Sequence, residues 1–262
     1  MPIIGINYDK CTNCRLCVRE CPRRFIEDDE KKRVYFQDPT SSCNLCGHCI
    51  AICPAEAIIY EKLGDDPYVF DGIEDLSNYI SYEKLANFMQ ATRSIRHYKK
   101  KKVPEELLRK IVQAMSYAPT AANLRGEKIA ILSDPQRIKA LSDAILKIKL
   151  PGWEESFEIR KKYYENVIFF DAPHVIIVYS LGNSTLDHYN IGNIITYGRL
   201  AAQSLGLGTC YNGRTQIAFE YNRKLTKIAG IRGKCWGVIT IGYPNVQYLR
   251  CPPRSQKKIK SL

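Results

Sequence analysis

Eight of the eleven cysteines fall into two copies of one spacing, Cys-x-x-Cys-x-x-Cys-x-x-x-Cys-Pro, and the second copy begins 32 residues after the first. Thiolates at three-residue steps can surround a small inorganic cluster, and the proline turns the chain after the fourth cysteine. The repeat therefore predicts metal-bound thiolates in a reducing compartment rather than disulfides. The two copies consist of Cys11, Cys14, Cys17 and Cys21, followed by Cys43, Cys46, Cys49 and Cys53.

This duplicated run is typical of bacterial two-cluster ferredoxins, in which the fourth cysteine of each copy ligates the other cluster. We therefore predict two [4Fe–4S] clusters that each take three ligands from one copy and one from the other. The first is assigned to Cys11, Cys14, Cys17 and Cys53, and the second to Cys43, Cys46, Cys49 and Cys21. Structural zinc is the alternative metal, but zinc sites use separated Cys-x-x-Cys pairs. The charged insert at 27–33 is predicted to be a solvated loop.

The net positive charge of the chain lies after this repeat. Residues 1–65 carry 9 basic and 10 acidic side chains, whereas residues 66–262 carry 30 and 17. The shift predicts a first domain at 1–65, a turn-rich linker at 66–81 and a second domain at 82–262. No apolar run approaches the ~18 residues that a membrane helix needs, so no membrane contact is expected. No nucleic-acid motif accompanies the basic charge, which argues against nucleic acid as the partner.

Helical and strand patterns interleave irregularly in the second domain. A helix is predicted to begin near Ser81, with Tyr82, Leu85, Phe88 and Met89 on one apolar face. Further helices are predicted at 104–117, 134–146 and 187–205, and buried strands at 128–132, 174–180 and 236–241. The predicted fold class is therefore α+β: a small ferredoxin-like domain followed by an α+β sandwich rather than a doubly wound sheet.

Arg93, Ser94 and Arg96 stand at the end of the first of these helices. Two guanidiniums and a hydroxyl at this spacing can surround a phosphate. Three more segments follow: a polar turn at 118–123, a glycine-rich turn at 206–213, and Arg254 in a proline-rich tail. The glycine-rich turn begins with Gly206, which is predicted to close a helix. It is not a dinucleotide fingerprint, because it follows a helix and Tyr211 holds its third glycine position.

In order and spacing, these segments resemble the nitroreductase family of FMN flavoproteins over about residues 82–256, and the whole chain resembles ferredoxin–nitroreductase fusions. The resemblance implies a nitroreductase-like sandwich and a homodimer with FMN in the subunit interface. It implies that Arg93, Ser94, Arg96 and Arg254 hold the FMN phosphate, that Asn123 contacts the isoalloxazine, and that the backbone of Asn212 and Gly213 lies near flavin N5. Family members often carry arginine in place of Thr92 and a different sequence around Arg125.

Together these observations predict a cytoplasmic FMN-dependent oxidoreductase that is fed through its own clusters by reduced ferredoxin or another low-potential donor. The chemistry takes place at FMN, so no catalytic side chain is expected, and the acceptor is a small molecule such as a nitroaromatic or a quinone. The physiological substrate stays open, as does a direct role of NAD(P)H. Two alternatives also stay open: an electron-transfer or redox-sensing protein without turnover of its own, and a flavin-modifying enzyme that consumes its flavin.

Overall fold

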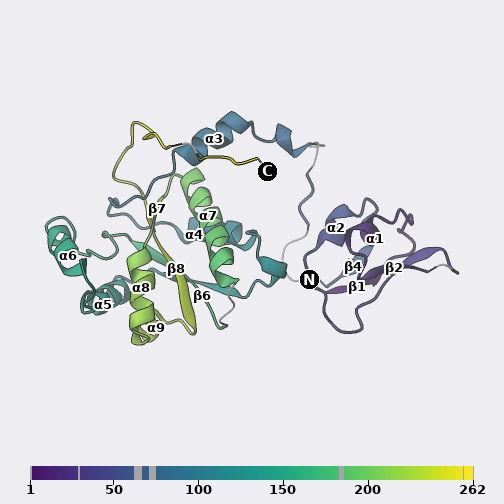
Figure 1. Cartoon of the computed structure of the whole chain (residues 1–262), viewed down its shortest axis with the longest axis horizontal. Helices are drawn as coiled ribbons and strands as arrows, with labels where there is room; N and C mark the ends of the chain where they lie inside the picture. Colours follow the sequence, from purple (N-terminus) through teal and green to yellow (C-terminus); the bar gives the residue numbers. More distant parts are fainter. Residues whose placement is uncertain are drawn as a thin grey trace. The chain divides into compact units, whose positions relative to one another are not determined.

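A computed structural model of the chain (Figure 1) describes residues 2–28, 30–61, 67–70, 75–182, 186–255 and 257–261. The chain divides into two compact units, Met1–Tyr79 with Ala122–Leu124, and Ile80–Ala121 with Arg125–Leu262. Part of the predicted linker at 66–81 lies outside the described residues, so the domain boundaries stay a prediction. Within the described ranges, no helix has the length and apolar character that crossing a membrane requires.

The described residues of the first unit form two antiparallel strand pairs, two short α-helices and one 3-10 helix. Its elements are β1 (Ile3–Ile6), α1 (Leu16–Glu20), β2 (Phe25–Asp28), β3 (Arg33–Phe36), α2 (His48–Ile52), β4 (Ile58–Tyr60) and the 3-10 helix η1 (Leu76–Asn78). β1 pairs with β4, so Ile6 lies opposite Ile58 although most of the unit separates them in sequence. β2 pairs with β3.

The prediction of a solvated loop at 27–33 is wrong at both of its ends. Glu27 and Asp28 belong to β2, and Arg33 belongs to β3. The hairpin forms because Phe25 and Val34 are each only 1% exposed and pack into the core of the unit. The sequence prediction missed the hairpin because most residues of the insert are charged. In the two strands, buried apolar side chains alternate with side chains that stay outside the core.

The second unit is built on one four-stranded antiparallel sheet, in the order β5-β6-β8-β7. The strands are β5 (Glu127–Leu132), β6 (His174–Ser180), β7 (Gly208–Tyr211) and β8 (Lys234–Gly242). Successive residues of β6 enter different cores, because Val175 and Ile177 pack on one face of the sheet while Ile176 and Val178 pack on the other. Both faces of the sheet are therefore covered, which explains the unbroken apolar run of this strand.

Helices form the two outer layers of the second unit (Figure 1). One core contains residues of α4 (Glu105–Ser116) and α7 (Asp187–Ser204), which pack against each other. The other core contains residues of α5 (Pro135–Leu146), α6 (Trp153–Lys161), α8 (Gly213–Tyr221) and α9 (Lys224–Ala229). The 3-10 helix η2 (Ala121–Asn123) is divided between the units, because Ala121 belongs to the second unit and Ala122 and Asn123 belong to the first. This helix–sheet–helix layering confirms the predicted α+β sandwich.

The helix predicted from Ser81 is α3 (Tyr82–Gln90), and the Ser81 hydroxyl caps it by accepting from the N–H of Lys84 at 3.3 Å. Three residues of its apolar face stay exposed, Tyr82 at 79%, Met89 at 51% and Leu85 at 39%, whereas Phe88 is half-buried. The described residues of this chain therefore cover the predicted apolar face only in part.

The glycine-rich turn at 206–213 is partly a strand. Gly206 closes α7 as predicted, with φ of 72° and a hydrogen bond from the N–H of Leu207 to the carbonyl of Ala202 at 2.8 Å. The chain then enters β7 at Gly208 instead of turning. The pairing with β8 extends the sheet by one edge strand, an interaction that local glycine content does not reveal.

Candidate functional site

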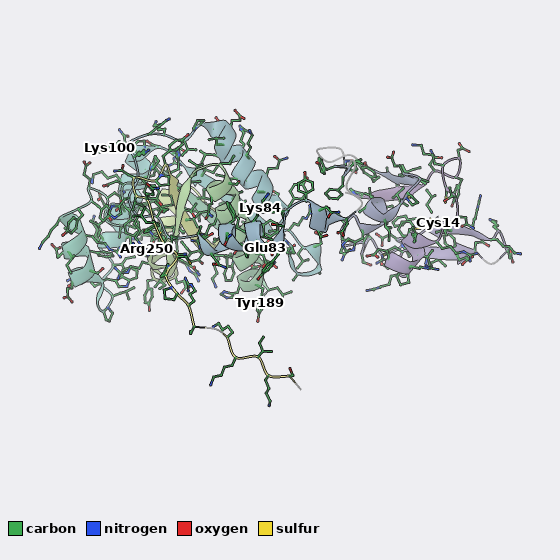
Figure 2. The ribbon with its side chains drawn as sticks, turned by 90° about the horizontal axis from the view of Figure 1, so that it is seen from above. Cys14, Glu83, Lys84, Lys100, Tyr189 and Arg250 are labelled. Atoms are coloured by element: carbon green, nitrogen blue, oxygen red, sulfur yellow. The ribbon has the colours of Figure 1, made fainter. Side chains whose placement is uncertain are left out.

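The first unit contains a cavity lined by the four cysteines assigned to the first cluster. Cys11, Cys14 and Cys17 come from the first copy of the repeat, and Cys53 comes from the second. The rest of the lining is apolar at Ile6, Leu16, Val34, Ala57 and Ile58 and polar at Thr12, Asn13 and Arg15. Cys14 is the exposed member of the four (Figure 2). The structure thus brings together the set expected for crossed ligation, in a mainly apolar surrounding.

The four cysteines of the second assignment also lie near one another. Burial, together with the charges of Cys46, Cys43 and Cys21, raises the pKa of the Cys49 thiol to about 12. Such mutual repulsion disfavours free thiolates, whereas bound iron cations would offset it. The residues present therefore fit a cluster, which would supply single-electron transfer when bound.

Among the residues that the structure describes, no group of three His, Cys, Asp or Glu side chains is arranged to share one metal ion. The choice of [4Fe–4S] over the zinc alternative therefore rests on the duplicated cysteine spacing.

The two cysteine loops share an unusual backbone conformation. Asn13 and Arg15 have positive φ in the first copy, and Leu45 and Gly47 have it at the equivalent positions in the second. Left-handed residues alternating with others turn successive N–H groups toward one side, where they can donate to sulfur. Downstream of the second loop, the N–H of Ala57 donates to the Cys53 sulfur at 3.3 Å. The repeat therefore preserves loop geometry as well as cysteine spacing.

In the second unit, the segment with Arg93, Ser94 and Arg96 lies beside β7. Ser94 forms a parallel bridge with Thr209, and the N–H of Ile95 donates to the carbonyl of Thr209 at 2.9 Å. Gly208 permits this approach, since a Cβ built there would lie 2.6 Å from Cγ1 of Ile95. The structure thereby brings the predicted phosphate segment alongside the strand that leads to Asn212 and Gly213.

Asn212 and Gly213 form the start of α8. Asn212 is 7% exposed, accepts from the N–H of Thr215 at 3.2 Å and donates to the carbonyl of Ile168 at 2.7 Å. Its side chain therefore holds the turn. The backbone N–H groups of the first helical turn, beginning at Gly213, lie at the positive end of the helix dipole and could donate to a flavin nitrogen or oxygen.

Arg93 is held against the C-terminal tail. Its Nη2 donates to the sulfur of Cys251 at 3.0 Å, and its Nη1 donates to the carbonyls of Gln90 and Thr92, each at 2.7 Å. Arg254 is exposed and follows Cys251 by three residues. The tail that carries Arg254 is therefore fastened to the predicted phosphate segment.

Asn123 differs from the other predicted FMN residues because it belongs to the first unit. Ala122–Leu124 clusters with the first unit, where the Asn123 side chain donates to the carbonyls of Asn44 and Leu45 at 2.8 and 3.0 Å. Its predicted contact with the isoalloxazine stays a prediction.

The sequence did not point to two arginines of the second unit, Arg160 and Arg214. Arg160 of α6 and Arg96 lie over the ring of Phe170, with Cζ atoms 5.0 and 5.8 Å from its centroid. Arg214, next to Gly213, lies 5.8 Å from the ring of Trp153. No short motif contains Arg160 or Arg214, because two separate segments supply them. The one sequence signal for Arg214 was its position directly after Asn212 and Gly213.

Each half of the chain matches a known protein family. The nitroreductase family matches residues 89–243, and the 4Fe-4S dicluster domain matches residues 10–58. A ferredoxin of Methanothermococcus thermolithotrophicus is 35% identical over 61 residues, which cover 22% of this chain and 98% of that protein. An NADH dehydrogenase of Thermus thermophilus is 48% identical over 52 residues, which cover 20% of this chain and 25% of that protein.

The solved structure of a nitroreductase with bound FMN from Desulfitobacterium hafniense DCB-2 has a similar fold, with a TM-score of 0.58 and 20% identity over 68% of this chain and 97% of that chain. The chain spans only 8% to 52% of the length of the Thermus protein and six other curated relatives, so their activities as whole proteins are not transferred.

The predicted resemblance, fold class and enzyme class are confirmed by these matches, and the predicted cofactors, two [4Fe–4S] clusters and FMN, agree with them. The individual ligand and FMN residues stay predictions. Because the family match covers more than half of the sequence, the chain belongs to the nitroreductase family of oxidoreductases and carries a 4Fe-4S dicluster ferredoxin domain at its N-terminal end.

Proposed function

We propose that this protein is an FMN-dependent oxidoreductase that receives electrons through its own two clusters and reduces a small acceptor such as a nitroaromatic or a quinone. The observation that carries the proposal is the union, in one chain, of a cysteine-lined cavity typical of electron transfer with a nitroreductase domain. When bound, FMN would take up electrons one at a time and deliver them to the acceptor in pairs. The side chains need only bind, orient and exclude water.

FMN binding is proposed along the segment beside β7. Arg93, Ser94 and the tail residue Arg254 would hold the phosphate, since Arg93 is already fastened to the tail at Cys251. Arg96 would extend this set at the other end of the segment. The N–H groups at the start of α8, from Gly213, would donate to the reactive edge of the ring and stabilise negative charge there.

Electron entry is proposed at the first cluster. Cys14 is exposed, whereas the other three cysteines of its set are half-buried, so a docked donor would come closest on that side. Reduced ferredoxin or a similar low-potential protein is the proposed donor. The cytoplasm is the proposed compartment, because the cluster cysteines must remain reduced to bind iron.

A homodimer is part of the proposal. α3 exposes Tyr82, Leu85 and Met89, which form an apolar surface that the described residues of the chain leave uncovered. Neighbouring exposed apolar residues of this kind are typical of an interface. A second copy of the chain is the partner that the family resemblance implies.

Anaerobic kinetics on the purified full-length chain test the function. The preparation should show iron–sulfur and flavin absorption together, and reduced ferredoxin should support steady-state reduction of a nitroaromatic. If both cofactors are reduced but no acceptor turns over, the protein is an electron-transfer or sensing protein instead. If the flavin itself is consumed during aerobic incubation, a flavin-modifying enzyme is the better description.

A further inference from the structure

The most shielded ion pair in the described part of the chain joins Arg24 to Asp38 in the first unit. Nη1 of Arg24 lies 3.0 Å from Oδ1 of Asp38, and the two side chains are only 11% and 16% exposed. Every other ion pair between described residues has a side chain that is more than half exposed. Removing two charges from water is unfavourable unless hydrogen bonds satisfy the rest of both groups. The hydrogen bonds around this pair therefore indicate its role.

The Asp38 carboxylate holds the backbone that leads into the second copy of the cysteine repeat. Its Oδ1 accepts from the N–H of Ser42 at 2.9 Å, and its Oδ2 accepts from the N–H of Cys43 at 3.1 Å. Nη2 of Arg24 donates to the Ser42 hydroxyl, so both the carboxylate and the loop fix the guanidinium. Because Cys43 is assigned to the second cluster, the ion pair contacts the backbone of one of its ligands directly.

The Arg24 end of the pair is attached to another ligand of the same cluster. The N–H groups of Arg24 and Phe25 both donate to the carbonyl of Cys21, at 3.1 and 3.0 Å. Cys21 comes from the first copy of the repeat and Cys43 from the second, and the crossed assignment gives both to the second cluster. The ion pair therefore links the two chain segments that must meet at this cluster.

The corresponding positions around the first cluster carry different groups. Glu56 follows the last cysteine of the second copy at the same spacing as Arg24 follows that of the first, and it is exposed and oppositely charged. The turn before Cys11 is held by the neutral side chain of Asn7, whose Oδ1 accepts from the N–H of Asp9 at 2.9 Å. The two cluster sites therefore share their cysteine spacing but differ in the fixed charges beside it.

We propose that Arg24 and Asp38 are positioning residues of the second cluster, which hold its Cys21 and Cys43 segments together and set its reduction potential separately from that of the first cluster. The carboxylate makes the addition of an electron to a nearby cluster less favourable, whereas the guanidinium makes it more favourable. In the intact pair these two effects oppose each other. The inference rests on the clusters of the proposed function, but not on its flavin or its acceptor.

Anaerobic redox titration of the purified full-length protein, followed by electron paramagnetic resonance, tests the inference. The signal of the second cluster is the one that Cys43→Ala removes. Arg24→Gln should lower the potential of that cluster and Asp38→Asn should raise it, each by about a tenfold change in the reduction equilibrium, or ~59 mV for one electron. The double variant should lie between them, and the first cluster should shift far less.

Iron release to a chelator tests the positioning role independently of charge. Arg24→Gln should lose the iron of the second cluster severalfold faster than the unmodified protein, while the first cluster is released at its original rate. Arg24→Lys keeps the positive charge without the planar fork that spans Asp38 and Ser42. It should therefore retain the original potential but still lose iron faster, and it carries the test if Arg24→Gln does not fold.

Lys31→Gln is the matched control, because Lys31 is paired with Asp28 in the same unit but is 63% exposed. It removes the same charge as Arg24→Gln and should leave both potentials and both release rates unchanged. Shifts of the same sign in Arg24→Gln and Asp38→Asn would overturn the inference, since they would indicate a loosened loop rather than two opposing charges. Equal effects on both clusters would also overturn it. Opposite shifts in a protein that reduces no acceptor would instead refute the proposed function and retain the inference.

Discussion

At the scale of single residues, the cysteine assignment is the sharpest claim. Cys53 lines the cavity of Cys11, Cys14 and Cys17, although it belongs to the other copy of the repeat. Cys53→Ala should therefore damage the same cluster as Cys14→Ala. Electron paramagnetic resonance of the reduced proteins should show the same surviving cluster in Cys53→Ala and Cys14→Ala. Cys43→Ala should show the spectrum of the other cluster. A Cys53→Ala spectrum that matches Cys43→Ala would show that each copy ligates its own cluster.

Arg93 is the residue that most directly tests the phosphate site. Arg93→Ala removes a guanidinium that is fastened to the tail, and a charge-assisted hydrogen bond contributes about 1.5–3 kcal/mol. FMN affinity should fall about 10- to 150-fold in a fluorescence titration, while iron content stays unchanged. Arg254→Ala should give a loss of similar size. Full FMN affinity in both variants would leave the phosphate site without support.

At the scale of elements, the contact between β7 and the segment 93–96 depends on one glycine. Gly208→Ala would place a methyl group against Ile95, at a cost of about 1–3 kcal/mol in the free energy of unfolding, and should weaken FMN binding. Gly192→Ala in α7 meets no atom within 4 Å and should be neutral or stabilising. The double variant Gly208→Ala/Ile95→Ala should regain FMN affinity; if it does not, the close approach is not the cause.

α3 carries the second prediction at this scale. Leu85→Asp should convert the dimer to monomers in sedimentation equilibrium without lowering the thermal stability of the monomer, because Leu85 is partly exposed in the single chain. Lys84→Asp, at the neighbouring position labelled in Figure 2, adds a negative charge without removing an apolar contact and should leave the dimer intact. A monomeric unmodified protein would refute the dimer itself.

At the scale of the whole molecule, the two parts of the sequence differ strongly in charge. Residues 1–65 carry one more acidic than basic side chain, and each oxidised cluster adds about two negative charges, whereas residues 66–262 carry 30 basic and 17 acidic side chains. An acidic ferredoxin should therefore be attracted to the basic part of the chain. Its electron transfer should slow severalfold between about 0.05 M and about 0.5 M salt. A small uncharged donor should show no such slowing, and equal salt dependence for both donors would exclude electrostatic docking.

Sequence spacing predicted a structural element correctly where that element depends on residues close in the chain. The helix start near Ser81 and the helix end at Gly206 both depend on neighbours within a few residues, and the structure has both where they were predicted. Long-range pairing was not accessible. β7 becomes a strand only because β8 pairs with it, and Arg96 and Arg160 lie over the same Phe170 ring although they come from segments far apart in the chain.

The pairing of β1 with β4 has a consequence for synthesis on the ribosome. Ile6 finds its partner only when Ile58 has emerged, and the cavity around Cys11 lacks one wall until Cys53 is present. The first cysteine loop therefore waits, open and unfilled, while the rest of its own unit is made. Iron delivery to the nascent chain is expected to occur late and to fill both sites nearly together, so half-loaded intermediates should be scarce during maturation.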